Sequence, residues 1–266
     1  MAQGTGKLEM LVRVGFFSRA ILYIVLGLIA LGAIGQISQG TAGIFETVDS
    51  IPGGNALLWV LVIGMVGYAM FRFASPAFDI ENKGSDAKGW AQRIGHAGSA
   101  IGHLALAWTA YKFATGAPGR SVNGAAEAAQ GVLSFDLGGP VIGILGIIFF
   151  LAALSQAIEA ATASFMHNIS SRAPEQTELV GRIGYATRAV IFAIIGWSLV
   201  QTGFLAADAS NVKTLGEAVA SLAAMGTLFT LVAIGLIMFG LFSLLLARYR
   251  IIPDIDEHAR KHVNAG

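Results

Sequence analysis

Three stretches of the sequence are apolar and contain no charged side chain over a length that few soluble folds tolerate. They lie between Asp49 and Arg72, between Asp136 and Glu159, and between Glu217 and Arg248. As a helix, each is long enough to cross a hydrocarbon core roughly 30 Å thick. Shorter runs of the same kind, each beginning next to an arginine, extend over 20–34, 94–111 and 189–207. Because 55% of the residues are hydrophobic and only 12% are charged, the sequence predicts an all-α membrane protein with six transmembrane helices.

The basic residues fall mostly on one side of these predicted spans. Of the 17 Lys and Arg residues, only Lys112, Arg120 and Lys213 lie on the side opposite to both termini. Because such an excess marks the cytoplasmic side, we expect a multi-pass protein of the bacterial inner (cytoplasmic) membrane with both termini in the cytoplasm. The sequence has no basic stripe with interleaved aromatic residues, which argues against nucleic-acid binding. It also has no cysteine, and therefore no thiolate nucleophile or thiolate metal site.

The sequence contains three copies of one unit. Three segments align without a gap and share Arg at the first, Gly at the third and Ala at the eighth position: RVGFFSRAILYIVLG (13–27), RIGHAGSAIGHLALA (93–107) and RIGYATRAVIFAIIG (182–196). Each is followed by a second apolar run, in which Gly64, Gly146 and Gly235 occupy matching places. Since self-similarity of this period indicates a repeat architecture, we predict three tandem two-helix repeats.

We place repeat one at 1–79, repeat two at 80–165, repeat three at 166–250 and a cytoplasmic tail at 251–266. The predicted spans cover about 15–35, 55–74, 94–115, 140–163, 184–205 and 225–247. Because every repeat has an even number of spans, the copies share one orientation and are expected to show pseudo-threefold symmetry about the membrane normal. Segments 44–51, 125–133 and 215–223 predict short amphipathic helices on the outer surface, with Glu46, Glu127 and Glu217 facing water.

A further pattern runs through the first helix of each repeat. It reads Arg, a hydrophobic residue, Gly, an aromatic residue, two further residues, Arg and Ala, and one second helix closes with GYAMFRF (67–73). This pattern resembles an uncharacterised bacterial inner-membrane family, a domain of unknown function built from three tandem two-helix transmembrane repeats. The resemblance covers nearly the whole chain and implies the same fold without implying an activity. Repeat two departs from the pattern, since Ser99 stands where the other copies have Arg19 and Arg188.

Most polar residues of these first helices fall on one helical face. Positions four, seven and eleven of the aligned segments share this face, because steps of three and four residues return to nearly the same direction at about 100° per residue. If the three faces meet at the pseudo-threefold axis, two guanidinium groups are available to bind an anionic solute or a lipid headgroup. This candidate site comprises Arg19, Arg188, Ser99, His96, His103, Tyr23 and Tyr185.

Other roles for these arginines are open. Arg19 lies roughly 9 Å of helical rise beyond Arg13, so its side chain can extend to the headgroups while its stem stays in the hydrocarbon. Alternatively, Glu159 and Asp79 lie near the inner ends of predicted helices and can pair with the arginines inside the bundle. The first arginine of each copy is predicted to anchor its helix at the cytoplasmic surface and so fix the topology. These topology anchors are Arg13, Arg93 and Arg182.

The sequence gives little support for metal binding or catalysis. His96 and His103 are about 10.5 Å apart along a helix, too far for two ligands of one metal ion. His258 and His262 are four residues apart, but the surrounding DEHARKH is typical of a solvated helix face. Ser99 is not surrounded by a recognisable serine-hydrolase motif. We therefore predict no metal site, no cofactor and no enzymatic activity.

Three functions are open at this point. The first is a non-catalytic membrane component that organises lipids or accompanies a larger complex, with membrane lipids, anionic phospholipid among them, and other membrane subunits as partners. The second is a transporter or binder of a small anionic solute or lipid headgroup at the repeat interface. The third is an intramembrane enzyme. A polar centre ringed by Arg19, Arg188 and His103 favours the second function, and arginines that face lipid favour the first.

Overall fold

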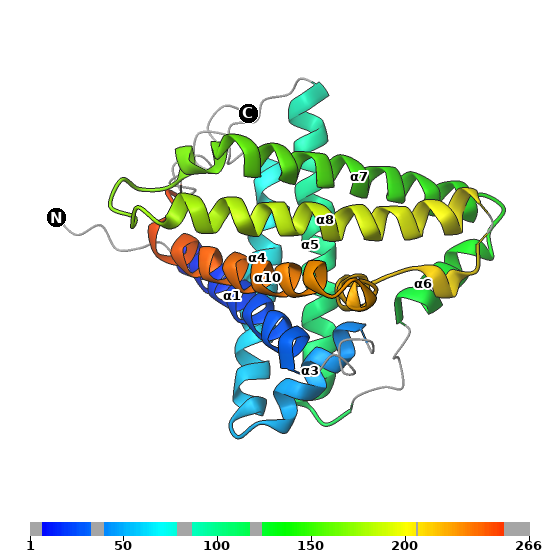
Figure 1. Ribbon diagram of the computed structural model, residues 1–266, viewed down its shortest axis with the longest axis horizontal. Coiled ribbons are helices and arrows are strands. Elements are labelled where there is room, and N and C mark those ends of the chain that lie inside the picture. Colours follow the sequence, from blue (N-terminus) through cyan, green and yellow to red (C-terminus); the bar gives the residue numbers. More distant parts are fainter. Residues whose placement is uncertain (1–6, 33–39, 79–86, 118–123, 206, 253–266) are drawn as a thin grey trace.

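The computed structural model describes residues 7–32, 40–78, 87–117, 124–205 and 207–252, and helices make up most of them (Figure 1). Six of these helices are long: α1 (Lys7–Gly32), α4 (Gly54–Phe78), α5 (Ala87–Ala114), α7 (Gly138–Thr162), α8 (Thr177–Phe204) and α10 (Thr227–Tyr249). The shorter helices are α3 (Gly40–Ser50), α6 (Gly124–Leu133) and α9 (Leu215–Ala220), with 3-10 turns η1 (Ser164–Asn168), η2 (Ala209–Asn211) and η3 (Ala223–Met225). The described part of the chain contains no β-strand, so the chain is all-α.

Glycine-rich turns separate the short helix from the following long helix in repeats one and two. Gly53 has a φ of 79°, in the left-handed region that favours glycine. The N–H of Gly54 donates to the carbonyl of Ile51 at 2.9 Å, and a side chain at Gly54 would collide with the carbonyl of Val48. Gly138 approaches the carbonyl of Val132 in the same way in repeat two. These turns therefore allow each short helix to fold back against the long helix that follows it.

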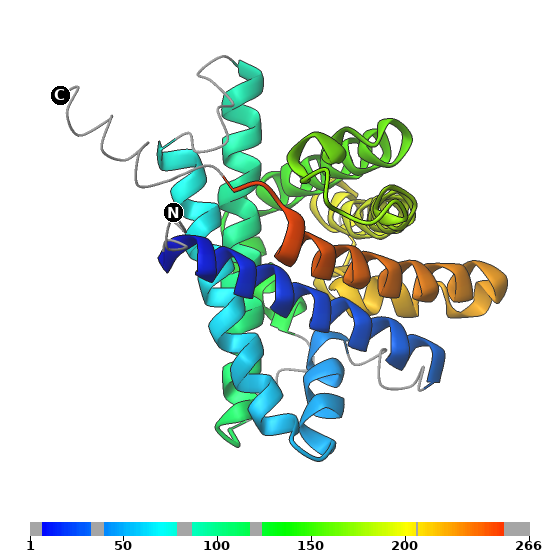
Figure 2. The ribbon, with the colours of Figure 1, turned by 90° about the vertical axis from the view of Figure 1, so that its left-hand side faces the viewer.

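The long helices form three side-by-side pairs. The second long helix of each repeat packs along the first long helix of the next repeat: α4 along α5, α7 along α8, and α10 back along α1. In Figure 1, α4 and α5 run vertically while α7 and α8 run horizontally, and Figure 2 shows that α1 and α10 take a third direction. The three pairs are joined to one another where α1 packs with α4 and α8 packs with α10, and no single direction is parallel to all six helices.

Within repeats one and three, the two long helices cross at glycines. The backbone of Gly64 on α4 lies against Ser18 on α1, and in repeat three Gly235 on α10 lies against Thr187 on α8. One turn away, Gly15 lies against the backbone of Tyr68, and its counterpart Gly184 lies against Phe239. Such small residues allow close helix packing in a membrane. The two crossings therefore match residue for residue.

Repeat two differs from the other copies. Its long helices α5 and α7 are not among the closely packed pairs of the described residues, whereas α1 packs with α4 and α8 packs with α10. Gly146, which the sequence aligns with Gly64 and Gly235, lies instead against the backbone of Gly196 on α8. The aligned glycine therefore packs within its own repeat in repeats one and three. In repeat two it packs against the following repeat.

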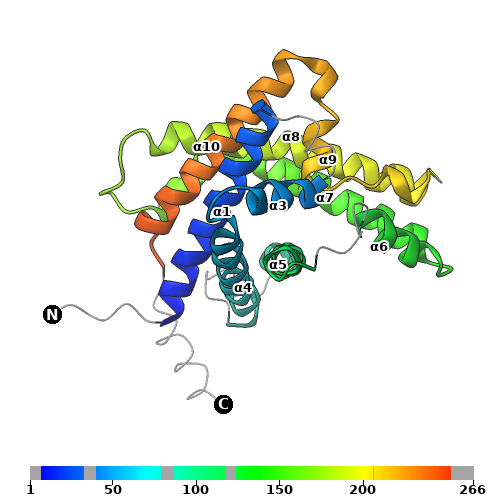
Figure 3. The same ribbon diagram turned by 90° about the horizontal axis from the view of Figure 1, so that it is seen from below.

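The short helices lie where the sequence predicts them, but two of them contribute to the core. Phe45 and Val48 of α3 are buried, as are Ala218 and Val219 of α9, and α3 contacts α4, α5 and α9 (Figure 3). The glutamates behave differently from one another. Glu46 and Glu127 are exposed, as expected. Glu217 is half-buried and accepts the N–H of Thr214 at 2.6 Å in a capping box, so its carboxylate caps α9 and is only partly exposed to water.

Four helices of the described residues are long and apolar enough to cross a membrane, namely α1 from Val12 onward, α7, α8 and α10. Their mean hydropathies lie between 1.6 and 2.5. The apolar part of α4, Gly54–Met70, is shorter. Large apolar side chains are exposed on α7 in particular, where Leu151 is 62% and Leu154 58% exposed. These features indicate a multi-pass membrane protein.

Candidate functional site

Arg19, in the middle of α1, points into the protein interior and is only 7% exposed. Its Nε donates to the hydroxyl of Ser243 on α10, and a terminal nitrogen donates to the hydroxyl of Tyr68 on α4, both at 3.1 Å. Its guanidinium carbon lies 4.8 Å, 5.5 Å and 5.0 Å from the ring centroids of Phe16, Tyr68 and Phe239. Hydroxyl groups and aromatic faces therefore stabilise this buried charge.

Arg188 on α8 reaches the same ring as Arg19. Its guanidinium carbon lies 4.7 Å from the centroid of Phe239 and 4.7 Å from that of Phe192. Its Nε is buried and has no hydrogen-bond acceptor in the part of the chain that the structure describes. A buried donor without an acceptor costs about 1–3 kcal/mol. Both predicted arginines therefore contact Phe239. The Nε of Arg19 has a hydrogen-bond acceptor, whereas the Nε of Arg188 has none among the described residues.

Two further arginines border this centre. Arg72 donates from Nε to the hydroxyl of Tyr68 at 2.9 Å, and the guanidinium carbon of Arg250 lies 5.4 Å from the ring centroid of Phe16. We call Arg19, Arg72, Arg188 and Arg250 the arginine cluster. Neither Arg19 nor Arg188 forms an ion pair with any described residue. The cluster therefore concentrates positive charge among aromatic rings, which is an environment suited to an anion.

Most of the other predicted site residues that the structure describes lie around the same rings. Tyr23 packs edge-on against Phe239 with ring centroids 4.7 Å apart, and Tyr185 lies 6.0 Å from Phe239. His103 on α5 lies 4.6 Å from the ring of Tyr68. Tyr23 of α1, Tyr185 of α8 and His103 of α5 are therefore gathered around the same group of aromatic rings. The sequence did not identify Tyr68, Phe239 and Ser243, because they are ordinary residues of apolar helices until their neighbours are known.

Several predicted residues lie outside what the structure describes. His96, Ser99 and Arg93 belong to α5, but their side chains are not among the described ones. Asp79, His258 and His262 fall outside the described residues. Among the residues that are described, no three His, Asp or Glu side chains gather closely enough to hold a metal ion.

The alternative roles suggested for Arg19 do not match its position. Its buried guanidinium group bonds to α4 and α10, so it does not extend to the headgroups as the snorkelling alternative supposed. Glu159, the described member of the two suggested acidic partners, accepts a hydrogen bond from the hydroxyl of Ser164 at 2.7 Å. Interior packing therefore accounts for Arg19 without a carboxylate partner among the described residues.

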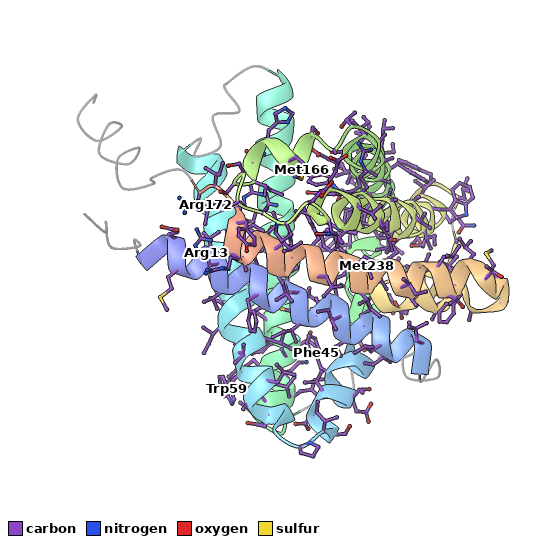
Figure 4. All side chains as sticks on the ribbon, turned by 60° about the vertical axis from the view of Figure 1, so that its left-hand side comes forward. Arg13, Phe45, Trp59, Met166, Arg172 and Met238 are labelled. Atoms are coloured by element: carbon purple, nitrogen blue, oxygen red, sulfur yellow. The ribbon has the colours of Figure 1, made fainter. Side chains whose placement is uncertain are left out.

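Arg13 and Arg182 bind the ends of neighbouring helices. Arg13 donates to the carbonyls of Ala247 and Arg248 at 2.8 Å and 3.0 Å, at the end of α10, where Figure 4 shows it. Arg182 donates in the same way to two carbonyls at the end of α7. A glutamate four residues earlier holds each arginine, Glu9 at 2.7 Å and Glu178 at 2.8 Å. Both arginines thus satisfy carbonyls left free by helix ends.

The fold and its repeated contacts define a class of protein, an all-helical membrane protein made of three related helix pairs. The chain belongs to the family described as Domain of Unknown Function (DUF1206), whose model matches it three times in tandem, at residues 14–78, 94–163 and 183–250. It is 29% identical over 248 residues to "Uncharacterized protein YxxB" of Bacillus subtilis (strain 168), covering 90% of each chain. No solved structure matches the chain.

Proposed function

We propose that all six long helices cross the bacterial inner membrane, with both termini in the cytoplasm and the three repeats related by pseudo-threefold symmetry. The excess of basic residues on one side supports this orientation. The matching crossings of α1 with α4 and of α8 with α10 support the symmetry. Because the three pairs run in three different directions (Figures 1 and 2), this arrangement requires helices that are tilted from the membrane normal.

We further propose that the protein is a non-catalytic membrane component that binds an anionic group, the phosphate or carboxylate of a lipid headgroup or small solute. The observation that carries this proposal is that Arg19 and Arg188 meet on Phe239 and that neither has an ion-pair partner among the described residues. An uncompensated charge inside a membrane protein is costly. An anion at the arginine cluster lowers that cost, and guanidinium groups present planar donor forks that suit phosphate and carboxylate.

The test replaces both arginines together. Wild type and the Arg19→Gln/Arg188→Gln variant are placed in nanodiscs of phosphatidylcholine with and without phosphatidylglycerol, and Tm and bound phospholipid are measured. We expect the anionic lipid to raise the Tm of wild type and to remain bound in native mass spectrometry, because it neutralises the cluster. The double variant should lose both effects.

A matched control removes the same charge elsewhere. Arg172 and Arg248 are exposed, and Arg172 lies on the loop between η1 and α8 (Figure 4). The Arg172→Gln/Arg248→Gln variant should therefore keep both the Tm shift and the bound lipid. If the double variant of Arg19 and Arg188 retains as much phosphatidylglycerol as this control, the anion site does not exist.

A further inference from the structure

The interface between α7 and α8 has the same register as the interface between α10 and α1. At the inner end, the first arginine of a repeat binds the end of the preceding long helix: Arg13 binds Ala247 and Arg248, and Arg182 binds Ala160 and Ala161. At the outer end, the fifteenth residue of the repeat lies against that helix: Gly27 against Ala233, and Gly196 against Gly146. The contacts at both ends give the same alignment of α10 with α7. In this alignment Ser243 on α10 corresponds to Gln156 on α7.

At this place the two interfaces differ in their hydrogen bonds. In the first interface, the Nε of Arg19 donates to the hydroxyl of Ser243 at 3.1 Å. In the second, the Nε of Arg188 and the Oε1 of Gln156 are both buried, and neither has a partner among the described residues. Tyr68, which accepts a second bond from Arg19, corresponds in repeat three to Phe239, which has no hydroxyl. Arg19 therefore has hydrogen-bond acceptors on α4 and α10, whereas neither equivalent position provides an acceptor that bonds to Arg188.

The unpaired donor of Arg188 and the unpaired acceptor of Gln156 lie at equivalent positions of one interface. A single bound group can therefore form hydrogen bonds with both. That group accepts a hydrogen bond from Arg188 and donates one to Gln156. The positive charge of Arg188 favours an anionic acceptor, and the amide oxygen of Gln156 requires a hydroxyl or ammonium donor. A phospholipid headgroup with a hydroxyl or ammonium group beside its phosphate carries both functions in one molecule.

The surroundings favour a lipid as the source of this group. Ser155 and Ala157, the neighbours of Gln156 on α7, are exposed, whereas their counterparts on α10, Phe242 and Leu244, are buried and half-buried. A hollow between α7 and α8, lined mostly by apolar residues that include Ala157 and Ala189, begins directly beside Gln156 and Arg188. Such an apolar surface suits an acyl chain. The surface beside Gln156 is therefore more exposed than the surface beside Ser243.

We propose that Arg188 and Gln156 bind the phosphate and the adjacent hydroxyl or ammonium group of one phospholipid headgroup, and that Arg19 is a structural residue. This inference rests on the proposed function, because it assigns the anion to one of the two arginines. Arg19 uses its donors on Ser243 and Tyr68 and holds α1 against α4 and α10.

The first experiment separates the two arginines. Arg188→Gln and Arg19→Gln are compared in phosphatidylglycerol nanodiscs by native mass spectrometry and thermal unfolding. We expect Arg188→Gln to reduce retained phosphatidylglycerol about tenfold, the effect of losing a hydrogen bond from a charged donor. Arg19→Gln should lower the Tm and leave retention unchanged. Ser243→Ala replaces Arg19→Gln if that variant does not fold. Equal losses for both arginines would overturn this inference alone, and no loss for either would overturn the proposed function.

The second experiment supplies Arg188 with an acceptor from the protein. Gln156→Glu places a carboxylate of the same shape opposite Arg188, and we expect it to raise the Tm and abolish lipid retention. Ser155→Glu adds the same charge at an exposed neighbour and should not raise the Tm. Gln156→Ala tests whether Gln156 and Arg188 simply bond to each other. If Gln156→Ala lowers the Tm but leaves retention unchanged, they do, and the inference is wrong.

The third experiment identifies the ligand chemistry. Phosphatidylmethanol has a phosphodiester without a neighbouring donor, so we expect wild type to retain it several-fold less than phosphatidylglycerol, with the difference lost in Gln156→Ala. Equal retention of the two lipids would contradict the role of Gln156. Soluble glycerol 3-phosphate tests the other source of the same chemistry. If it displaces phosphatidylglycerol from wild type at micromolar concentration, the ligand is a solute and the assignment to a lipid is wrong.

Discussion

At the scale of single residues, Arg13 and Glu9 allow the contribution of a helix-end contact to be separated from that of an ion pair. Arg13 contacts two carbonyls of α10 and the carboxylate of Glu9. A hydrogen bond from a charged donor stabilises a protein by about 1.5–3 kcal/mol, whereas an i, i+4 ion pair on a helix contributes only about 0.3–0.5 kcal/mol. The contacts with α10 therefore dominate.

The first prediction compares these two residues. Arg13→Gln should lower the free energy of unfolding by about 2–4 kcal/mol, because it leaves the end of α10 without its donors. Glu9→Gln should lower it by less than about 1 kcal/mol. Unfolding in detergent, followed by circular dichroism, measures both. Similar losses for the two variants would show that the ion pair, and not the contact with α10, is the stabilising interaction.

A second prediction at this scale concerns Asp208, which lies outside the long helices. Its carboxylate accepts the N–H of Ser210 at 2.8 Å, and this hydrogen bond holds the pKa of Asp208 below its usual value of 3.8. Since the native pKa is lower than the unfolded one, the carboxylate stabilises turn η2 above pH 3.8, and that stabilisation is lost as the pH falls through the native pKa.

Hydrogen exchange at the Ser210 amide, corrected for intrinsic rates, checks this prediction. Protection should decrease in acid for wild type, and the Asp208→Ala variant should have low protection that does not depend on pH. Equal acid dependence in the two proteins would assign the effect to another group.

At the scale of helices, the sequence predicted the existence and approximate extent of the six long helices, because uncharged runs of that length have few alternatives. It could not predict their partners. Gly146 aligns with Gly64 and Gly235 yet packs against a different helix, since a glycine is compatible with any close approach. The same holds for α3 and α9, whose short apolar faces fit a membrane surface and a protein core equally well.

The third prediction tests the glycine crossings. Gly64→Ala and Gly235→Ala should each lower the Tm, because the added methyl group would collide with Ser18 or Thr187. Gly102→Ala is the matched control, since no atom lies within 4 Å of the position of its added methyl group. It should be neutral or slightly stabilising, as alanine favours helix more than glycine does. A Tm loss for Gly102→Ala equal to that for Gly64→Ala would mean that the α1–α4 crossing is packed differently.

At the scale of the whole molecule, the sequence predicted that Arg19 and Arg188 occupy the same face of their respective helices, because position seven recurs in two repeats. It left open whether these faces meet lipid or protein, which depends on how the helix pairs pack against one another. The acceptors that distinguish Arg19 from Arg188 come from α4 and α10, and only the fold brings these helices against α1.

The fourth prediction concerns topology. The chain has no cysteine, so single cysteines report on one position each. With six spans, Ser50→Cys and Ser134→Cys should react with a membrane-impermeant maleimide in intact cells. Ser85→Cys, in the connector of repeats one and two, should react only after the membrane is permeabilised. If Ser85→Cys reacts in intact cells, this connector is not cytoplasmic, and the proposed topology is wrong.

The central claim is that the arginine cluster holds an anionic group inside the membrane protein. The most direct measurement is a cryo-electron microscopy map of the wild-type chain in phosphatidylglycerol nanodiscs. We predict density for a phosphate in hydrogen-bond contact with the guanidinium group of Arg188, with Gln156 beside it and Arg19 bonded to Ser243 and Tyr68. A map in which Arg188 is paired with a carboxylate of the chain itself, or turned outward to the headgroup region, would contradict this account.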